Sequence, residues 1–145
     1  YLKDSLTRLE LYNNLIYNTG DEGNAFLGEL SNLENLFLGS TLFEYDGIPT
    51  QIGKLTKLKE LDVSYTLYFG PLVEGMWGGL TDLSYCMLDG NAYSSSLPQD
   101  LVTLPHLGYL YASDSVLNGN LNFVASMPHI SELWLDQNPT FSASI

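Results

Sequence analysis

The chain has very little positive charge, and all of it lies in the first part of the sequence. Five Lys and Arg residues stand against 17 Asp and Glu in 145 residues, which gives a formal net charge of −12. No Lys or Arg follows Lys59, whereas acidic residues continue to Asp136. Such a surface repels phosphate groups, which disfavours nucleic acids and anionic membrane surfaces as partners. It favours a protein or peptide that carries basic or neutral polar groups.

Cysteine and long apolar runs are also scarce. Cys86 is the single cysteine, so an internal disulfide is excluded. Because Cys86 takes the place of a leucine in a repeating pattern, we expect a buried and unreactive thiol. No stretch approaches the ~18 consecutive apolar residues that a membrane-spanning helix needs.

The sequence also lacks the motifs of common enzymes. It contains no G-x-S-x-G, no P-loop and no H-E-x-x-H, so we expect no catalytic activity and no cofactor. His106 and His129 stand in equivalent P-H-L and P-H-I segments, and imidazole is a good metal ligand. No third ligand accompanies them at a suitable spacing, which favours a surface column of the repeat over a metal site.

What the sequence does have is a repeat of the form L-x-x-L-x-L-x-x-N-x-L. Six copies begin at intervals of 23 to 27 residues and use nearly the whole chain. We therefore predict one domain, residues 1–145, of about six repeats. The repeat cores are residues 6–16, 33–43, 58–68, 83–93, 107–117 and 130–140.

The spacing of the leucines predicts the role of each position. Within x-L-x-L-x, alternate residues face opposite sides of a short strand, so the leucines face inward and the intervening residues face outward. Parallel strands of successive repeats then stack ~4.8 Å apart in one sheet. After each strand, a short polar side chain is placed to bond the backbone groups of the turn. These positions are Asn14, Thr41, Thr66, Asn91, Ser115 and Asn138.

The returning half of each repeat completes the pattern L-x-G-x-I-P-x-x-I/L-G-x-L-x-x-L. Residues 47–66, GIPTQIGKLTKLKELDVSYT, match it best. The pattern resembles the plant-specific class of leucine-rich repeats. This resemblance implies an α/β-type, β-rich solenoid: a right-handed curved superhelix with a parallel sheet on its concave face and short 3₁₀ or strand segments on its convex face. It also favours an extracellular or organelle-lumenal location.

The chain departs from the family pattern at several places. Residues 20–26 are an insertion, and Glu74 and Asn122 replace the proline of the I-P element. Trp77 aligns with Ile52 and Leu101, so we expect it in the core. Residues 140–145 match the opening of a seventh element, and open solenoid ends normally need a cap. We therefore expect the chain to be part of a longer protein, or its ends to be covered by other subunits.

The outward strand positions predict a binding surface. Tyrosine, tryptophan and methionine side chains gather at outward positions of the later strands, with acidic residues beside them. Exposed apolar patches with a polar rim usually mark interaction sites, and these residue types are enriched in interfaces. The alternative is that the rings only stabilise neighbouring strands. We expect Tyr109, Tyr111 and Trp134 to be the anchors, with Glu132 at the edge. The predicted partner-binding residues are Phe37, Tyr65, Tyr85, Met87, Asp89, Tyr109, Tyr111, Asp114, Trp134 and Asp136.

Three functions are compatible with this pattern. The first is non-catalytic recognition of a protein or peptide through the concave face, the role that the family resemblance implies. The second is an architectural role as a peripheral subunit of a larger assembly, held through its uncapped ends. The third is binding of carbohydrate or ice, which the irregular and partly charged outward columns disfavour.

Overall fold

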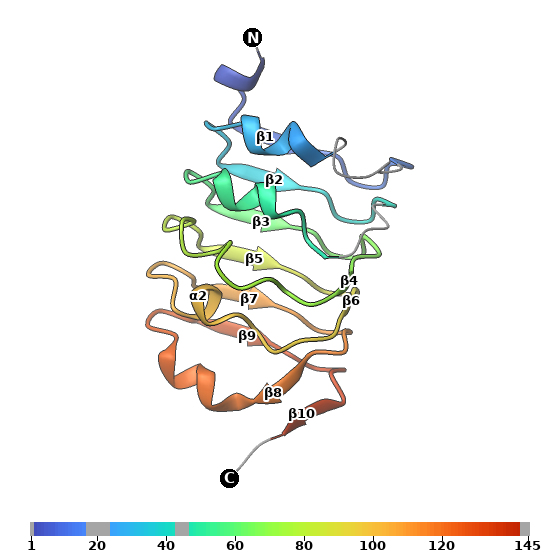
Figure 1. Cartoon of the computed structure of the whole chain (residues 1–145), viewed down its shortest axis with the longest axis vertical. Helices are drawn as coiled ribbons and strands as arrows, with labels where there is room; N and C mark the ends of the chain where they lie inside the picture. The colour runs from blue at the N-terminus through green and yellow to red at the C-terminus, as the bar shows by residue number, and fades with distance from the viewer. Residues whose placement is uncertain (1, 17–23, 43–46, 143–145) are drawn as a thin grey trace.

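The computed structural model describes residues 2–16, 24–42 and 47–142. It is a stack of repeats with the N-terminus at one end and the C-terminus at the other (Figure 1). The insertion at residues 20–26, the second repeat core at 33–43 and the segment 140–145 lie partly outside the described residues. None of the described helices is long and apolar enough to cross a membrane.

One strand from each predicted repeat core enters a six-stranded parallel sheet. The strands lie in chain order, because each repeat places its strand beside that of the preceding repeat. Each pair is in register, so that Leu9, Leu36 and Leu61 are directly aligned. The strands are β1 (Arg8–Glu10), β2 (Asn35–Phe37), β3 (Glu60–Asp62), β5 (Tyr85–Met87), β7 (Tyr109–Tyr111) and β9 (Glu132–Trp134).

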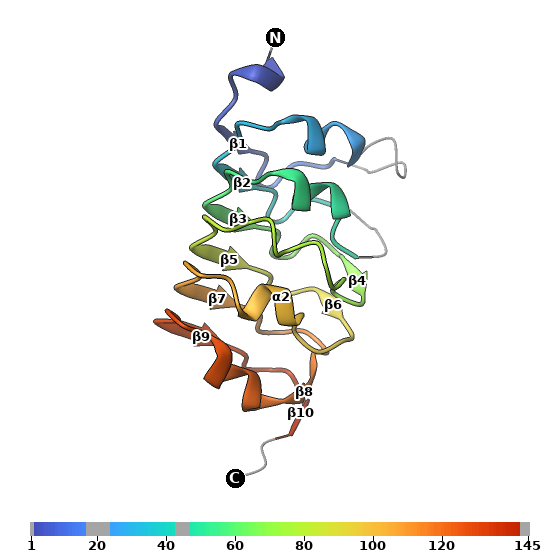
Figure 2. The ribbon, with the colours of Figure 1, turned by 60° about the vertical axis from the view of Figure 1, so that its left-hand side comes forward.

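The returning halves form a second layer opposite the sheet (Figure 2). Short helices dominate it, which confirms the expected fold class. They are η1 (Leu2–Asp4), η2 (Leu27–Glu29), η3 (Thr50–Lys54), α2 (Gln99–Val102) and η4 (Leu121–Ser126). Two small parallel sheets connect the layers, and they are formed by β4 (Phe69–Gly70) with β6 (Ala92–Tyr93) and by β8 (Asn118–Asn120) with β10 (Thr140–Ser142).

The core lies between these two layers and follows the leucine columns. Leu36, Leu61 and Leu110 are fully buried, whereas Leu9 and Leu133 in the first and last strands are only partly buried. Two expectations are confirmed here. Cys86 is buried, and burial raises the pKa of its thiol well above the ordinary value, which disfavours the reactive thiolate. Trp77 is also buried, and its indole Nε1 donates to the carbonyl of Val73 at 3.1 Å.

The polar position after each strand satisfies the turn, as the sequence predicts. Asn91 Nδ2 donates to the carbonyls of Val63 at 2.8 Å and Leu88 at 3.0 Å, and its Oδ1 accepts from the amides of Thr66 and Tyr68 at 3.1 Å. Asn138 repeats this arrangement in the last repeat. One amide side chain thus bonds two successive repeats, which stabilises the stack because buried backbone groups need partners.

The residue before this polar position adopts the left-handed conformation in every repeat. The values of φ lie between 50° and 65°, although the side chains differ widely. The turn therefore sets this conformation, since most non-glycine residues disfavour it. The six residues are Asn13, Ser40, Tyr65, Gly90, Asp114 and Gln137.

Glu74 has a clear role in place of the expected proline. Its Oε1 accepts from the amide of Gln99 at the start of α2 in the next repeat, at 2.7 Å. In return, Asp100 Oδ2 accepts from the amides of Trp77 at 2.8 Å and Gly78 at 3.1 Å. The two carboxylates therefore connect the fourth and fifth repeats by accepting hydrogen bonds from backbone amides. A proline at position 74 has no side-chain acceptor and could not form the bond that Glu74 accepts.

Candidate interaction surface

The outward surface of the six strands, here called the sheet face, brings most of the predicted site residues together. The register pairs Tyr85 with Tyr109 and Met87 with Tyr111, and it pairs Tyr111 with Trp134. These five side chains therefore occupy three adjacent strands, β5, β7 and β9. We call them the aromatic cluster: Tyr85, Met87, Tyr109, Tyr111 and Trp134.

The rings of the aromatic cluster contact one another but do not cover one another. The Tyr111 ring centroid lies 5.0 Å from that of Trp134 in an edge-on arrangement, and 5.4 Å from that of Tyr85. Tyr85 and Tyr109 are 6.1 Å apart. Such geometries are favourable for aromatic pairs. Nevertheless, Tyr109 is 41% exposed and Trp134 is 56% exposed, so large ring surfaces face solvent.

A hydrogen bond fixes the central ring of the cluster. The Tyr111 hydroxyl donates to Glu132 Oε2 at 2.7 Å across the β7–β9 pair. This bond and the negative charge of Glu132 favour the neutral phenol and raise the pKa of Tyr111 to about 12. Tyr111 is thus held in place by a hydrogen bond, whereas Tyr109 in the same strand and Trp134 in the next strand remain exposed to solvent.

Acidic side chains border the cluster where the strands end. Asp89 Oδ1 accepts from the Ser113 amide at 2.6 Å, and the Ser113 hydroxyl donates to Asp136 Oδ1. Burial and the nearby charges of Asp136, Asp62 and Asp114 raise the pKa of Asp89 even though the Ser113 bond opposes this. The hydroxyl of Ser113 lowers the pKa of Asp136. Negative charge is therefore concentrated beside the exposed rings, where it attracts cations.

The N-terminal part of the sheet face is different, and the expectation for Phe37 as an exposed residue is wrong. Phe37 is only 7% exposed. The Tyr12 ring stacks on it at 5.7 Å between centroids, and the Arg8 guanidinium lies 4.6 Å above its ring. Tyr12 and Arg8 therefore occupy the surface that a partner would need.

Asp62 is covered by the same tyrosine. The Tyr12 hydroxyl donates to Asp62 Oδ2 at 2.7 Å, and the Ser64 amide and hydroxyl donate to Asp62 Oδ1 at 2.8 and 2.6 Å. Burial and the bond to Asp62 raise the pKa of Tyr12. We call Arg8, Tyr12, Phe37, Asp62 and Ser64 the closed group, because their polar and aromatic surfaces are used within the chain.

Tyr65 lies apart from the aromatic cluster. It follows β3 in the left-handed conformation and is 53% exposed. Its ring lies over Gly90, where an added Cβ would come within 2.1 Å of the ring carbons. Tyr65 therefore covers the turn of the next repeat, at the border between the sheet face and the side of the solenoid.

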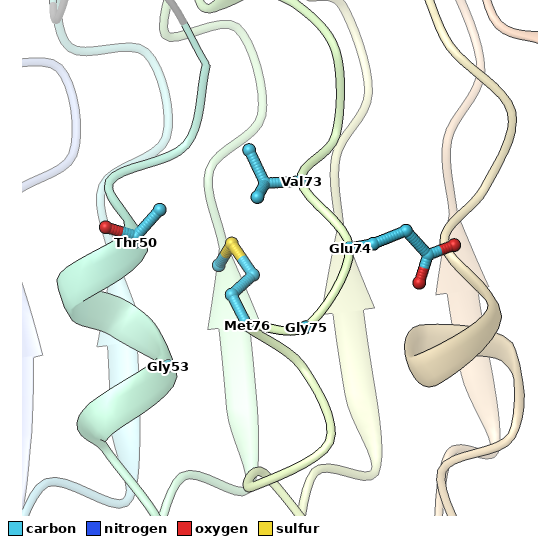
Figure 3. A pocket seen from close by; sticks show the side chains of 6 residues that line it. All are labelled: Thr50, Gly53, Val73, Glu74, Gly75 and Met76. Atoms are coloured by element: carbon cyan, nitrogen blue, oxygen red, sulfur yellow. The ribbon is translucent and has the colours of Figure 1, made fainter.

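A shallow cavity lies in the opposite layer. Its volume is about 290 Å³, and Thr50, Gly53, Val73, Glu74, Gly75 and Met76 line it. Figure 3 shows that the Glu74 side chain points away from Thr50, toward the next repeat. An added Cβ on Gly53 would lie 2.4 Å from the Met76 carbonyl oxygen, so close packing of neighbouring repeats determines this region.

The two histidines lie at equivalent positions of the fifth and sixth repeats. His106 and His129 are exposed, and His106 Nδ1 lies 2.8 Å from the Thr81 carbonyl oxygen. No group of three or more His, Cys, Asp or Glu among the described residues could hold a metal ion.

Comparison with known proteins gives the family. No protein-family model matches the chain. Receptor-like protein 39 of Arabidopsis thaliana is 32% identical over a match that covers 68% of this chain and 14% of that protein. Receptor-like protein 41 of the same plant is 39% identical over 75 residues, which is 52% of this chain and 8% of that protein. The chain thus spans a small fraction of the length of these curated relatives.

A solved structure agrees with these relatives. The leucine-rich-repeat ectodomain of the plant membrane receptor kinase GASSHO1/SCHENGEN3 from Arabidopsis thaliana, in complex with CASPARIAN STRIP INTEGRITY FACTOR 2, superposes with a TM-score of 0.81 at 26% identity. The match covers 98% of this chain and 16% of the ectodomain. The chain belongs to the plant-specific class of leucine-rich-repeat proteins.

Proposed function

We propose that this leucine-rich-repeat segment recognises a protein or peptide through its sheet face, without catalysis. The observation that carries the proposal is the aromatic cluster, in which Tyr109 and Trp134 expose large rings beside acidic groups. Exposed aromatic side chains dominate the energy of many interfaces, and strand packing alone does not require them to face solvent.

The charge pattern defines the chemistry of the partner. Asp89, Asp114 and Asp136 lie beside the cluster, and no Lys or Arg follows Lys59. A segment that presents Lys or Arg next to apolar side chains would place its cations near these carboxylates and over the electron-rich ring faces. The partner is therefore a basic peptide segment, either free or part of a larger protein.

The relatives support this role and the compartment. The GASSHO1/SCHENGEN3 ectodomain is a membrane receptor domain in complex with CASPARIAN STRIP INTEGRITY FACTOR 2. A second solved structure, PEPR1–AtPEP1, is 25% identical to this chain with a TM-score of 0.79. By analogy with such ectodomains, this segment acts on the extracellular side as part of a receptor-like protein.

The test uses a displayed library of random peptides as the probe, because selection on the wild-type chain does not require the natural partner to be identified. We expect selection to enrich peptides with Lys or Arg next to an apolar residue. Replacing Tyr109, Tyr111 and Trp134 by Ala should weaken their binding by about 30-fold or more, since a hot-spot residue contributes at least 2 kcal/mol. Unchanged affinity in this triple variant would contradict the proposal.

A matched control removes an exposed ring elsewhere. Phe26 is 46% exposed and precedes η2 in the layer opposite the sheet. We expect Phe26→Ala to leave the affinity unchanged. Raising the salt concentration should slow association more than it speeds dissociation, because the acidic groups act mainly on the approach of a cationic partner.

A further inference from the structure

The N-terminal end of the sheet face shows how this chain places an arginine on an aromatic ring. The Arg8 guanidinium lies 4.6 Å from the centroid of the Phe37 ring, and its Nε donates to the carboxylate of Glu10. The register aligns Arg8 with Asn35 and Glu10 with Phe37, so these four residues form a square on β1 and β2. Within this square, one guanidinium contacts both a carboxylate and a ring.

The corresponding square on β7 and β9 has rings and a carboxylate but no arginine. We call it the open square: Tyr109, aligned with Glu132, and Tyr111, aligned with Trp134. Trp134 takes the place that Phe37 has in the first square, and Tyr109 takes the place of Arg8. Phe37 is 7% exposed, whereas Trp134 is 56% exposed. No Lys or Arg follows Lys59, so the later repeats provide no cation for the open square.

The groups of the open square favour a planar donor. Glu132 is exposed, and its Oε2 accepts from the Tyr111 hydroxyl at 2.7 Å. Carboxylate and phenol oxygens thus lie beside the exposed rings of Tyr109 and Trp134. A guanidinium has five N–H donors in one plane, so it can lie on a ring and donate to a carboxylate at the same time. A lysine ammonium is a more strongly hydrated point charge, which makes it a weaker match at an exposed site.

We propose that the open square binds an arginine side chain of the partner, with the guanidinium on the Trp134 ring and its N–H groups directed to the Glu132 carboxylate. The inference rests on the proposed function, because it names the residue by which the aromatic cluster selects a basic peptide segment. The arginine of the partner takes the role that Arg8 has at the other end of the sheet face.

The test uses peptides selected from a displayed library on the wild-type chain. We expect an arginine to recur at one position of these peptides. Its replacement by lysine should weaken binding by about tenfold, because the ammonium cannot lie flat on a ring and donate to the carboxylate at the same time. Glu132→Gln should weaken the arginine peptide to a similar extent and remove most of the difference between the two peptides. Isothermal titration calorimetry measures both affinities.

Tyr111→Phe is the matched control, because Glu132 also accepts from the Tyr111 hydroxyl. This variant removes the hydroxyl and keeps the ring and the carboxylate. Any change in affinity that it causes should affect the arginine and lysine peptides alike. A preference for arginine that survives in Glu132→Gln and is lost in Tyr111→Phe would overturn the assignment of the guanidinium to the carboxylate.

The peptide results separate this inference from the proposed function. Peptides that require the rings of Tyr109, Tyr111 and Trp134 but bind equally well with lysine in place of arginine would overturn the inference and leave the proposed function intact. Peptides whose affinity is unchanged when all three rings are removed would overturn both.

A substitution within the chain tests the open square without any partner. Tyr109→Arg places a guanidinium opposite Glu132, at the position that Arg8 has relative to Phe37. We expect its thermal midpoint to lie about 3 °C above that of Tyr109→Lys, which carries the same charge without the planar group. Equal midpoints in the two variants would overturn the preference for arginine.

Discussion

The two ends of the sheet face have the same backbone and different surfaces. Phe37 in β2 and Trp134 in β9 occupy the same position in their strands, yet one is 7% exposed and the other is 56% exposed. Phe37 is covered because Tyr12 and Arg8 lie across it, and Tyr12 also bonds Asp62. At the position of Tyr12, the last two repeats have Ser113 and Asp136, which cannot cover a ring. In a repeat protein, therefore, the neighbouring columns decide whether an outward aromatic residue stabilises the chain or faces a partner.

The strongest test of this comparison removes both rings separately. Phe37→Ala should lower the free energy of unfolding by about 3 kcal/mol, because it removes a buried ring. Trp134→Ala should lower it by only about 1 kcal/mol, the scale of the edge-on contact with Tyr111. Chemical denaturation of both variants measures the difference. Equal losses would mean that the two ends of the sheet face do not differ energetically.

Removing one carboxylate from the closed group and one beside the aromatic cluster tests whether the polar contacts at the two ends of the sheet face differ in energy. Asp62→Ala should cost about 2 kcal/mol, because Asp62 is buried and the Tyr12 and Ser64 hydroxyls would lose their charged partner. Asp114→Asn removes the carboxylate of an exposed residue and keeps a side chain that suits its left-handed conformation, so it should change the free energy of unfolding by less than about 0.5 kcal/mol. The measurement is again denaturant unfolding at pH 7. A comparable effect at both positions would contradict the claim that the hydrogen bonds of Asp62 stabilise the closed group.

Asp89→Asn should show that acidic groups near the aromatic cluster reduce stability. The raised pKa of Asp89 means that the folded state prefers the protonated form; this preference stabilises the fold fully at pH values below the unfolded-state pKa and is lost as the pH rises through the folded-state pKa. At pH 7, the neutral amide should therefore raise the free energy of unfolding by up to about 1 kcal/mol. The gain should shrink below pH 4, where the carboxyl is protonated in both states. A loss of stability at neutral pH would show that the bond to Ser113 outweighs the repulsion.

The smallest expected effect concerns Tyr111. Its pKa of about 12 lies above the ordinary 10.0, so its neutral form contributes stability below pH 10 that is lost as the pH rises toward 12. Glu132→Gln should return the pKa of Tyr111 toward 10.0, because the amide carries no charge. A pH titration of the tyrosine ring signals by NMR follows this residue directly. An unchanged pKa in Glu132→Gln would mean that the hydrogen bond does not hold Tyr111 in solution.

Some features of the structure could be predicted from the repeat pattern, and others could not. The register of Tyr85, Tyr109 and Glu132 follows from counting along the repeats, since parallel strands of equal repeats align. The burial of Trp77 and Cys86 follows from the same alignment. The left-handed conformation of Leu67 could not be predicted in this way, because its φ depends on how the turn packs against the next repeat.

The sequence by itself determined the repeat frame, the inward and outward columns and the gathering of aromatic residues on the later strands. These properties are periodic, and a strand has only two sides. The tertiary structure alone decided which outward residues are covered. Coverage of Phe37 and Asp62 depends on side chains from other repeats, on their length and on the direction in which they lie across the sheet. Residue type alone does not set that direction, because it is set by contacts between neighbouring strands.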